Sequence, residues 1–331
     1  MRLQMASNGE ASVPGSEFVH QAFIYSSDRE FLDFALPFIE AGLSAGQPTL
    51  VAVQDRHCES LRAALGDTAK GLTLCPSEDW YETSARTREK FARWVAEHAW
   101  IGGRARLIAE PPWALGREAQ VRDWARHESV INIAFAGQPL TLICPYDAQA
   151  LPEEILRHAR ATHPEIVDPE GVSANPSYED PIDFCERMDS TVEAQRGTPA
   201  LELNFGLEDL PGVRRTVKSF AHEAGMADWR ADELVLAVNE VTTNAVIHGR
   251  PPATARVWHA DGEVVVEVAD AGEGINDALA GQLSPAPTAL GGRGLWLTRL
   301  LCDAVEVRSP NGSAVTVRAA TISDDRPLTA A

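Results

Sequence analysis

The sequence predicts an α/β protein of two parts, an N-terminal, mostly parallel α/β sandwich and a C-terminal two-layer α/β sandwich. In the first half of the 331-residue chain, short apolar runs alternate with longer amphipathic helical patterns. That order favours a mostly parallel sheet covered by helices on both faces. In the second half, pairs of strand-like runs flank turn sequences, which indicates antiparallel hairpins.

The elements of the first half follow one another in a regular order. The strand-like segments are 22–25, 49–54, 72–75, 106–109 and 140–144. The helical patterns are 28–45, 57–65, 84–100, 117–135 and 152–161. Asp28 or Ser27 is expected to cap the first helix, and Gly46 follows its end. No G-x-x-x-x-G-K-[ST] sequence follows any of these strands, so this half is not expected to bind ATP through a P-loop.

The second half predicts a sheet of four or five mainly antiparallel strands with helices on one face. It opens with a strand at 200–205 and continues with helices at 211–224 and 233–249. Two hairpins are expected, with strands at 255–260 and 263–269 around Asp261-Gly262, and at 304–309 and 314–318 around Pro310-Asn311-Gly312.

The composition restricts the classes of function. With 48 acidic and 29 basic residues, the net charge is −19, which argues against direct nucleic-acid binding. The cysteines are Cys58, Cys75, Cys144, Cys185 and Cys302. They are odd in number and lack C-x-x-C spacing, which favours reduced thiols over a disulfide framework or a zinc site. Because no apolar run approaches the length of a membrane span and no signal-peptide core is present, we expect a cytoplasmic protein.

The boundaries between the parts follow from proline content and polarity. The expected units are a disordered tail (1–16), a first domain (17–166), a linker (167–198), a second domain (199–320) and a C-terminal tail (321–331). The linker contains several prolines and accommodates one short helix, around 183–195.

A first chemical motif lies in the helix at 233–249. Glu240 and Asn244 are four residues apart, so they project from the same face of the helix. The apolar stripe that would pack on the sheet is separate, and packing requires neither an acid nor an amide on the other face. An acid beside an amide can activate a hydroxyl group or water and bind Mg²⁺ through oxygen atoms. Taken alone, the pair is also typical of a solvated helix face.

Two glycine-rich motifs follow. The strand at 263–269 leads into Asp270-Ala271-Gly272-Glu273-Gly274, and the parity of Asp270 places its carboxylate on the face of the alternate valines. A buried carboxylate there could accept a hydrogen bond from the exocyclic amine of an adenine. Further along, Gly291-Gly292-Arg293-Gly294-Leu295 precedes an apolar helix. Glycines at such a position let backbone N–H groups approach phosphates.

The order of these motifs, E-x-x-x-N, D-x-G-x-G and G-x-G-L, resembles the ATPase superfamily of gyrase, histidine kinases and MutL. Within it, LAVNEVTTNAVIHG and GGRGLWL resemble the anti-sigma-factor serine kinases over about 200–319. The resemblance implies a histidine-kinase-like ATPase fold that binds ATP with Mg²⁺ and forms a homodimer. It also implies phosphorylation of a serine on an anti-anti-sigma (STAS) protein, with a sigma factor as a further partner, in a stress-response switch of transcription.

The resemblance also implies a role for each motif residue. Glu240 would be the general base, Asn244 the Mg²⁺ ligand and Asp270 the adenine acceptor. The other residues implied in nucleotide binding are Gly272, Gly274, Gly292, Arg293, Gly294 and Ser313. Arg293 is equally compatible with a surface role. Residues 275–290 would form a lid over the phosphates, mobile without nucleotide.

Phrases of the first half resemble the MEDS domain, a sensory module named for methanogens, methylotrophs and a dichloromethane-response regulator. The phrases are HQAFIY (20–25), EPPW (110–113), HESVINIAF (127–135), CPYD (144–147) and THP (162–164). The resemblance implies a sensor of a small molecule or stress. The candidate ligand-binding residues are His20, Glu110, Trp113, His127 and Asn132, expected near the carboxyl ends of strands.

These sensory residues also have simpler interpretations. Trp113 could fill the core below a loop, and His127 with Glu128 could be a pair at the cap side of a helix. Joint metal coordination by His127 and Glu128 is not expected, because neighbouring positions on a helix diverge.

Two further classes of function stay open. The chain could be a non-catalytic, ATP-dependent sigma-factor-binding protein, although the intact Glu240 and Asn244 count against this. It could also be a sensor histidine kinase with an unrecognised acceptor. The prolines of the linker leave no room for two long acceptor helices, and His222 lies on a predicted helix of the ATPase fold itself.

Overall fold

The computed structural model describes residues 18–98, 103–113, 117–168, 171–190, 199–286, 288, 292–309 and 312–321. The N-terminal tail expected to be disordered and all of the C-terminal tail after residue 321 lie outside the described residues. So do Gly291 and the first two residues of the predicted turn at 310–312.

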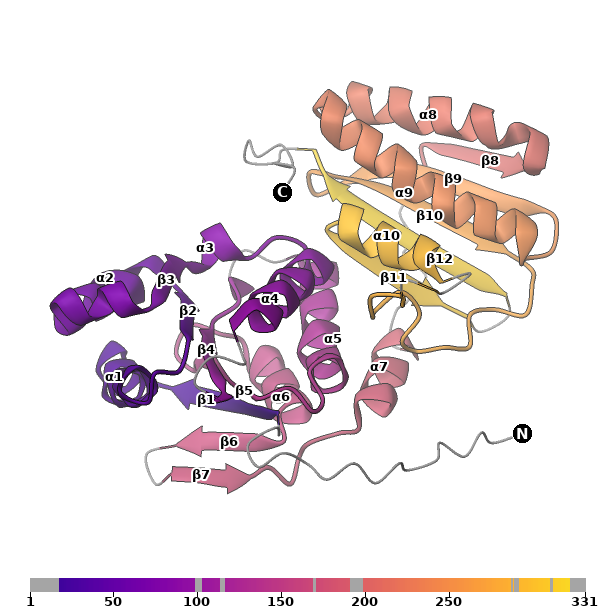
Figure 1. Ribbon diagram of the computed structural model, residues 1–331. Coiled ribbons are helices and arrows are strands. Elements are labelled where there is room, and N and C mark those ends of the chain that lie inside the picture. The colour runs from indigo at the N-terminus through magenta and orange to yellow at the C-terminus, as the bar shows by residue number, and fades with distance from the viewer. Residues whose placement is uncertain are drawn as a thin grey trace.

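The first domain is built on a mostly parallel sheet, as the sequence predicts (Figure 1). Its strands are β1 (Val19–Tyr25), β2 (Thr49–Val53), β3 (Thr73–Pro76), β4 (Ala105–Ala109), β5 (Leu140–Asp147), β6 (Glu165–Asp168) and β7 (Gly171–Ala174), in the order β3-β2-β4-β5-β1-β6-β7. Neighbouring strands from β3 to β6 are parallel, and β7 is antiparallel to β6.

Helices cover both faces of this sheet. They are α1 (Asp28–Ser44), α2 (Asp55–Leu65), α3 (Ser77–Trp80), α4 (Ser84–His98), α5 (Glu118–Ala134) and α6 (Glu153–Thr162), with a 3₁₀ helix at Gly66–Gly71. Alternate residues of a strand point to opposite faces, so Val51 joins the core under α1 and α2 while Leu50 joins the core under α4 to α6. The Oγ of Ser27 accepts a hydrogen bond from the backbone N–H of Glu30, which identifies Ser27 as the cap of α1.

Part of the segment predicted to be a linker belongs to the first domain. β6 pairs with β1 and β7 pairs with β6, so the sheet continues to Ala174. The one expected helix is present as α7 (Pro181–Ser190), where Phe184 and Met188 pack against Ala125 of α5. Two strands of four residues beside several prolines give too short a hydrophobic pattern to be recognised in the sequence.

The second domain is an antiparallel sheet with helices on one face, which confirms the predicted class (Figure 1). The strands are β8 (Leu201–Phe205), β9 (Ala253–Ala260), β10 (Glu263–Asp270), β11 (Ala304–Arg308) and β12 (Ser313–Ala320), in the order β11-β12-β10-β9-β8. A 3₁₀ turn (Leu207–Asp209) leads into α8 (Leu210–Glu223), which is followed by α9 (Asp228–Ile247) and α10 (Arg293–Leu301). Valines of β10 pack against the apolar stripe of α9 that includes Leu234 and Val238.

The two domains meet through α4 and α5 on one side and α10 and β11 on the other (Figure 1). Ion pairs cross this boundary at Arg86–Glu233 (2.7 Å), Arg117–Glu263 (3.2 Å), Arg122–Glu306 (2.5 Å) and Asp123–Arg299 (3.3 Å). The Arg88 guanidinium donates a hydrogen bond across it to the backbone carbonyl of Gln282. Because a buried charge is costly without a partner, these pairs favour this particular docking of the domains.

Within the residues described, no helix combines the length and apolar character needed to cross a membrane.

Candidate functional site

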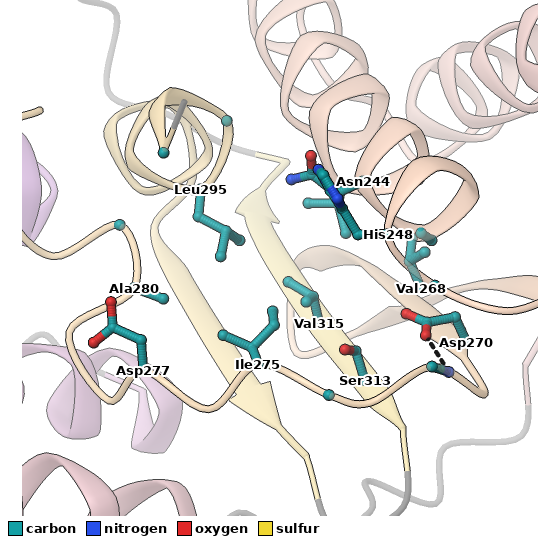
Figure 2. Close-up of a pocket in the computed structure, with 18 of the residues that line it drawn as sticks. Asn244, His248, Val268, Asp270, Ile275, Asp277, Ala280, Leu295, Ser313 and Val315 are labelled. Carbon is teal, nitrogen blue, oxygen red and sulfur yellow. Dashed lines mark hydrogen bonds between the residues drawn. The ribbon is translucent and has the colours of Figure 1, made fainter. Parts of the chain in front are cut away.

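A pocket of about 820 Å³ lies in the second domain between α9, α10 and the ends of β10 and β12 (Figure 2). Residues from all three sequence motifs line it, although the motifs are far apart in the chain. The predicted nucleotide-binding residues in its wall are Asn244, Asp270, Gly272, Gly274, Gly292, Gly294 and Ser313. The fold therefore brings the three motifs to one cavity.

Asp270 is the last residue of β10 and pairs in register with Ser313, the first residue of β12. Its Oδ1 accepts a hydrogen bond from the backbone N–H of Gly272 at 2.7 Å, and the carboxylate lies at the pocket edge in Figure 2. A Cβ at Gly249 would come within 2.5 Å of Asp270 Cγ, and one at Gly272 within 2.7 Å of Asp270 Oδ1. The two glycines therefore make room for a carboxylate that can accept from an amine.

Glu240 and Asn244 lie one turn apart on α9, facing the start of α10. A Cβ at Gly294 would lie 3.1 Å from Asn244 Nδ2 and 3.1 Å from Glu240 Oε2. Gly292, the residue before α10, has a left-handed φ of 80°, which favours glycine. The unsatisfied N–H groups of the first turn of α10 thus lie beside an acid and an amide.

The pocket has the chemistry that ATP with Mg²⁺ requires. Glu240 and Asn244 supply carboxylate and amide oxygens, which are the donors that Mg²⁺ prefers. The absence of a side chain at Gly294 leaves their shared space open. Apolar side chains offer contacts for a flat base, and they are Val241, Val268, Ile275, Leu295 and Val315.

Two predicted residues lie differently from the others. Arg293 is exposed at the start of α10 and is not among the lining residues, so the structure favours its surface interpretation. Glu240 is likewise not among the lining residues. It is half-buried, and a Cβ at Gly294 would lie 3.1 Å from its Oε2.

His248 and Asp277 line the pocket but were not predicted to do so. His248 follows Asn244 by four residues at the end of α9, and Figure 2 shows both side chains at the same wall. The helical spacing is a signal that could have identified His248 from the sequence. Asp277 lies on the loop opposite, where no periodic pattern marks the residues that face inward.

The predicted lid, 275–290, is described up to residue 286 and at 288. A Cβ at Gly281 would lie 2.6 Å from the backbone carbon of Leu295, so this loop packs directly on α10. Arg299 of α10 donates to the backbone carbonyl of Ala280 at 3.3 Å. The segment covers one side of the pocket in this arrangement, and its mobility without nucleotide stays a prediction.

In the first domain, His20 and Asn132 come together as expected. His20 Nδ1 lies 3.0 Å from Asn132 Oδ1, and His20 Nε2 lies 3.5 Å from the buried carboxylate of Glu128. His127 turns away from them, with its Nδ1 3.2 Å from the Arg88 guanidinium. Burial and the Arg88 charge lower the pKa of His127 well below its usual range. The expected position at the carboxyl end of a strand is wrong for His20, which is the second residue of β1.

Glu110 and Trp113 do follow the carboxyl end of β4, but they join other groups. Glu110 accepts from the Tyr25 hydroxyl at 2.9 Å and lies 3.2 Å from His57 Nδ1, in a buried polar network. Trp113 packs against Tyr146, with ring centroids 5.9 Å apart. The five candidate sensory residues are therefore divided among at least three surroundings.

Comparisons with known proteins agree with both resemblances. Residues 19–164 match the family described as MEDS, the MEthanogen/methylotroph, DcmR Sensory domain. Residues 203–319 match the histidine kinase-like ATPase domain. Among solved structures, the Acinetobacter baumannii histidine kinase AdeS is similar over 42% of this chain and 76% of that chain, with 12% identity and a TM-score of 0.24. No curated protein matches the chain significantly.

Proposed function

We propose that this chain, which joins a MEDS sensory domain to a histidine kinase-like ATPase domain, is a signal-responsive anti-sigma-factor-type regulator. Its reaction would be phosphorylation of a serine on an anti-anti-sigma (STAS) partner. The main support is the convergence of Glu240 and Asn244 on Gly294, because it sets an acid beside the glycine turn that would hold the phosphates.

Three motif residues at the pocket then have defined tasks. Asp270 accepts a hydrogen bond from the adenine amine, and the apolar lining contacts the base. Asn244 would hold Mg²⁺, which when bound neutralises charge on the phosphate oxygens. Glu240 takes the proton from the attacking serine hydroxyl. Phosphoryl transfer depends mainly on positioning and charge neutralisation, and these groups supply both.

The segment that connects the two domains favours a hydroxyl group of a partner protein over an internal histidine as the phosphate acceptor. In the described part of the segment 165–200, the helical structure is α7, which has 10 residues and packs on α5. An acceptor hairpin needs two long helices. His222 belongs to α8 of the ATPase domain, where its Nε2 lies 3.1 Å from an oxygen of Asp228. Neither feature provides an acceptor site.

Signal response is supported by the contacts between the domains. Arg88 of α4 binds the backbone of Gln282 in the lid, and Asp123 of α5 pairs with Arg299 of α10. The lid and α10 both border the pocket. A ligand of the first domain that favoured one position of α4 and α5 would therefore alter the pocket.

The test is transfer of labelled phosphate from ATP, with Mg²⁺, to a STAS protein from the same genome, followed by phosphoamino-acid analysis. The proposal expects acid-stable phosphoserine on the STAS protein. Acid-labile label on the chain itself would instead indicate a histidine kinase. Absence of label together with ATP-dependent capture of a sigma factor would indicate the non-catalytic class, and either result overturns the serine-kinase proposal.

A further inference from the structure

A second cluster of chemically active groups lies inside the first domain, away from the pocket of the ATPase domain. It consists of His20 on β1, Glu128 on α5, Cys144 on β5 and His163 after α6. All four residues are buried, and their ligand atoms lie within 4.8 Å of one another.

The spacing of these atoms matches that of a small coordination sphere. Cys144 Sγ lies 3.4 Å from His20 Nε2 and 3.4 Å from Glu128 Oε2. Glu128 Oε2 lies 3.5 Å from His20 Nε2 and 3.5 Å from His163 Nε2. A tetrahedral Zn²⁺ with bonds of about 2.0–2.3 Å separates its ligand atoms by about 3.3–3.8 Å. Four of the six separations in the cluster fall in this range, and the other two are at most 4.8 Å.

The outer nitrogen of each histidine is already engaged, as in metal sites. His20 Nδ1 contacts Asn132 Oδ1 at 3.0 Å, and His163 Nδ1 contacts the backbone carbonyl of Ala159 at 2.8 Å. Such contacts hold the Nδ1 proton and direct the Nε2 lone pair inward. Asn132 is itself held by the backbone carbonyl of Thr162 at 2.8 Å.

The inner nitrogen of His163 is a buried polar atom whose lone pair faces the cluster. His163 is completely buried, and its Nε2 has no hydrogen-bond partner among the residues that the structure describes. A buried polar atom without a partner is costly, and so is a buried carboxylate such as Glu128 without a compensating charge. A cation at the centre of the cluster would satisfy both groups at once.

We propose that His20, Glu128, Cys144 and His163 bind one divalent transition-metal ion in the sensory domain. The mixture of imidazole, thiolate and carboxylate is typical of Zn²⁺ and unlike the all-oxygen sites of Mg²⁺ or Ca²⁺. This assignment departs from the expectation drawn from cysteine spacing. The ligands come from four separate segments, and each lies in one of the phrases that resemble the MEDS domain. No two of them have a local spacing typical of metal ligands, so the sequence did not identify them as a metal site.

The metal site would lie on a route to the ATPase domain. Glu128 is next to His127 on α5, and His127 contacts Arg88, which binds the lid backbone at Gln282. An ion that draws Glu128 inward would therefore shift α5. That shift would also move His127, which contacts Arg88. The binding claim itself does not depend on the proposed kinase reaction.

The experiment uses the full chain, stripped of metal by a chelator, with Zn²⁺ for titration and Co²⁺ as a spectroscopic probe. We expect one Zn²⁺ per chain, and Co²⁺ bound with tetrahedral d–d bands and a thiolate-to-cobalt charge-transfer band. Cys144→Ala should abolish the charge-transfer band, and His163→Gln should weaken Zn²⁺ binding by about 10-fold or more. Asn132→Leu should weaken it by about 10–100-fold, because an outer contact of His20 is lost.

The matched control is Cys58→Ala, which removes a buried cysteine of the same domain that lies outside the cluster. It should keep both the stoichiometry and the charge-transfer band, and circular dichroism reports whether each variant is folded. Absence of a stoichiometric Zn²⁺ site in the parent protein would overturn the proposal. So would a thiolate band that survives in folded Cys144→Ala or disappears in folded Cys58→Ala.

Discussion

Arg88 on α4 donates a hydrogen bond to the backbone carbonyl of Gln282, so a buried cation of the first domain holds the loop that covers the pocket of the second. Burial lowers the pKa of Arg88 to about 10, which leaves the guanidinium charged at neutral pH. A charged donor makes this contact stronger than an ordinary hydrogen bond between neutral groups. The pair is therefore a direct physical connection between sensory domain and lid.

Replacing Arg88 by methionine should loosen the lid. A hydrogen bond to a charged group contributes about 1.5–3 kcal/mol, so local opening around Gln282 should increase about 10–100-fold. Hydrogen exchange of the amides at 279–284 measures this opening. Arg62→Met is the control, because Arg62 also donates to a backbone carbonyl but is exposed and far from the lid. Equal exchange in Arg88→Met and the parent protein would mean that the contact does not restrain the lid.

Asp270→Asn should weaken ATP binding by about 10–100-fold. The amide can still accept from the Gly272 N–H through its oxygen, which leaves an NH₂ donor facing the donor amine of adenine. Calorimetric titration with ATP and Mg²⁺ measures the loss. Asp261→Asn, the same change in the exposed turn at the other end of β10, should bind as the parent protein does. Unchanged affinity in Asp270→Asn would refute the adenine assignment.

Gly294→Ala should impair transfer because its Cβ would press on both Glu240 and Asn244. Displacement of catalytic groups by about 1 Å can reduce a rate by about 10²-fold, and we expect a loss of that order. Gly212→Ala in α8 is the control, since a Cβ there meets no atom within 4 Å. If the transfer rates of both variants equal the parent rate, the close approach of α10 to α9 has no catalytic role.

The pocket that we propose to bind nucleotide could be predicted from the sequence because each of its parts is a local pattern. Glu240 and Asn244 share a helix face, Asp270 ends an alternating strand, and Gly292 and Gly294 start a helix. Each pattern is set by backbone geometry over a few residues. The fold around them follows from the periodicity of apolar residues, and the predicted strands and helices lie within about five residues of the observed bounds, whereas β6, β7 and α3 were not predicted.

Two features could not be predicted in the same way. One is the set of contacts between the two domains, and the other is the cluster proposed to bind a metal ion. Arg88 and Asp123 are charged residues on amphipathic helices, where the usual expectation is exposure to solvent. Their burial depends on the docking of a second domain, which no local pattern encodes. His20 and Cys144 are 124 residues apart and meet because β1 and β5 are adjacent in the sheet. Only the strand order brings them together.

The transfer rate of Glu240→Gln tests the central claim most directly. It is measured in a single turnover, with saturating ATP and Mg²⁺ and a STAS protein as acceptor. Glutamine keeps the shape but cannot take a proton, so ATP affinity should stay within about twofold while transfer falls about 10²–10⁴-fold. Glu208→Gln, at an exposed acid before α8, should transfer at the parent rate. Transfer by Glu240→Gln at the parent rate, with phosphoserine as product, would show that Glu240 is not the general base.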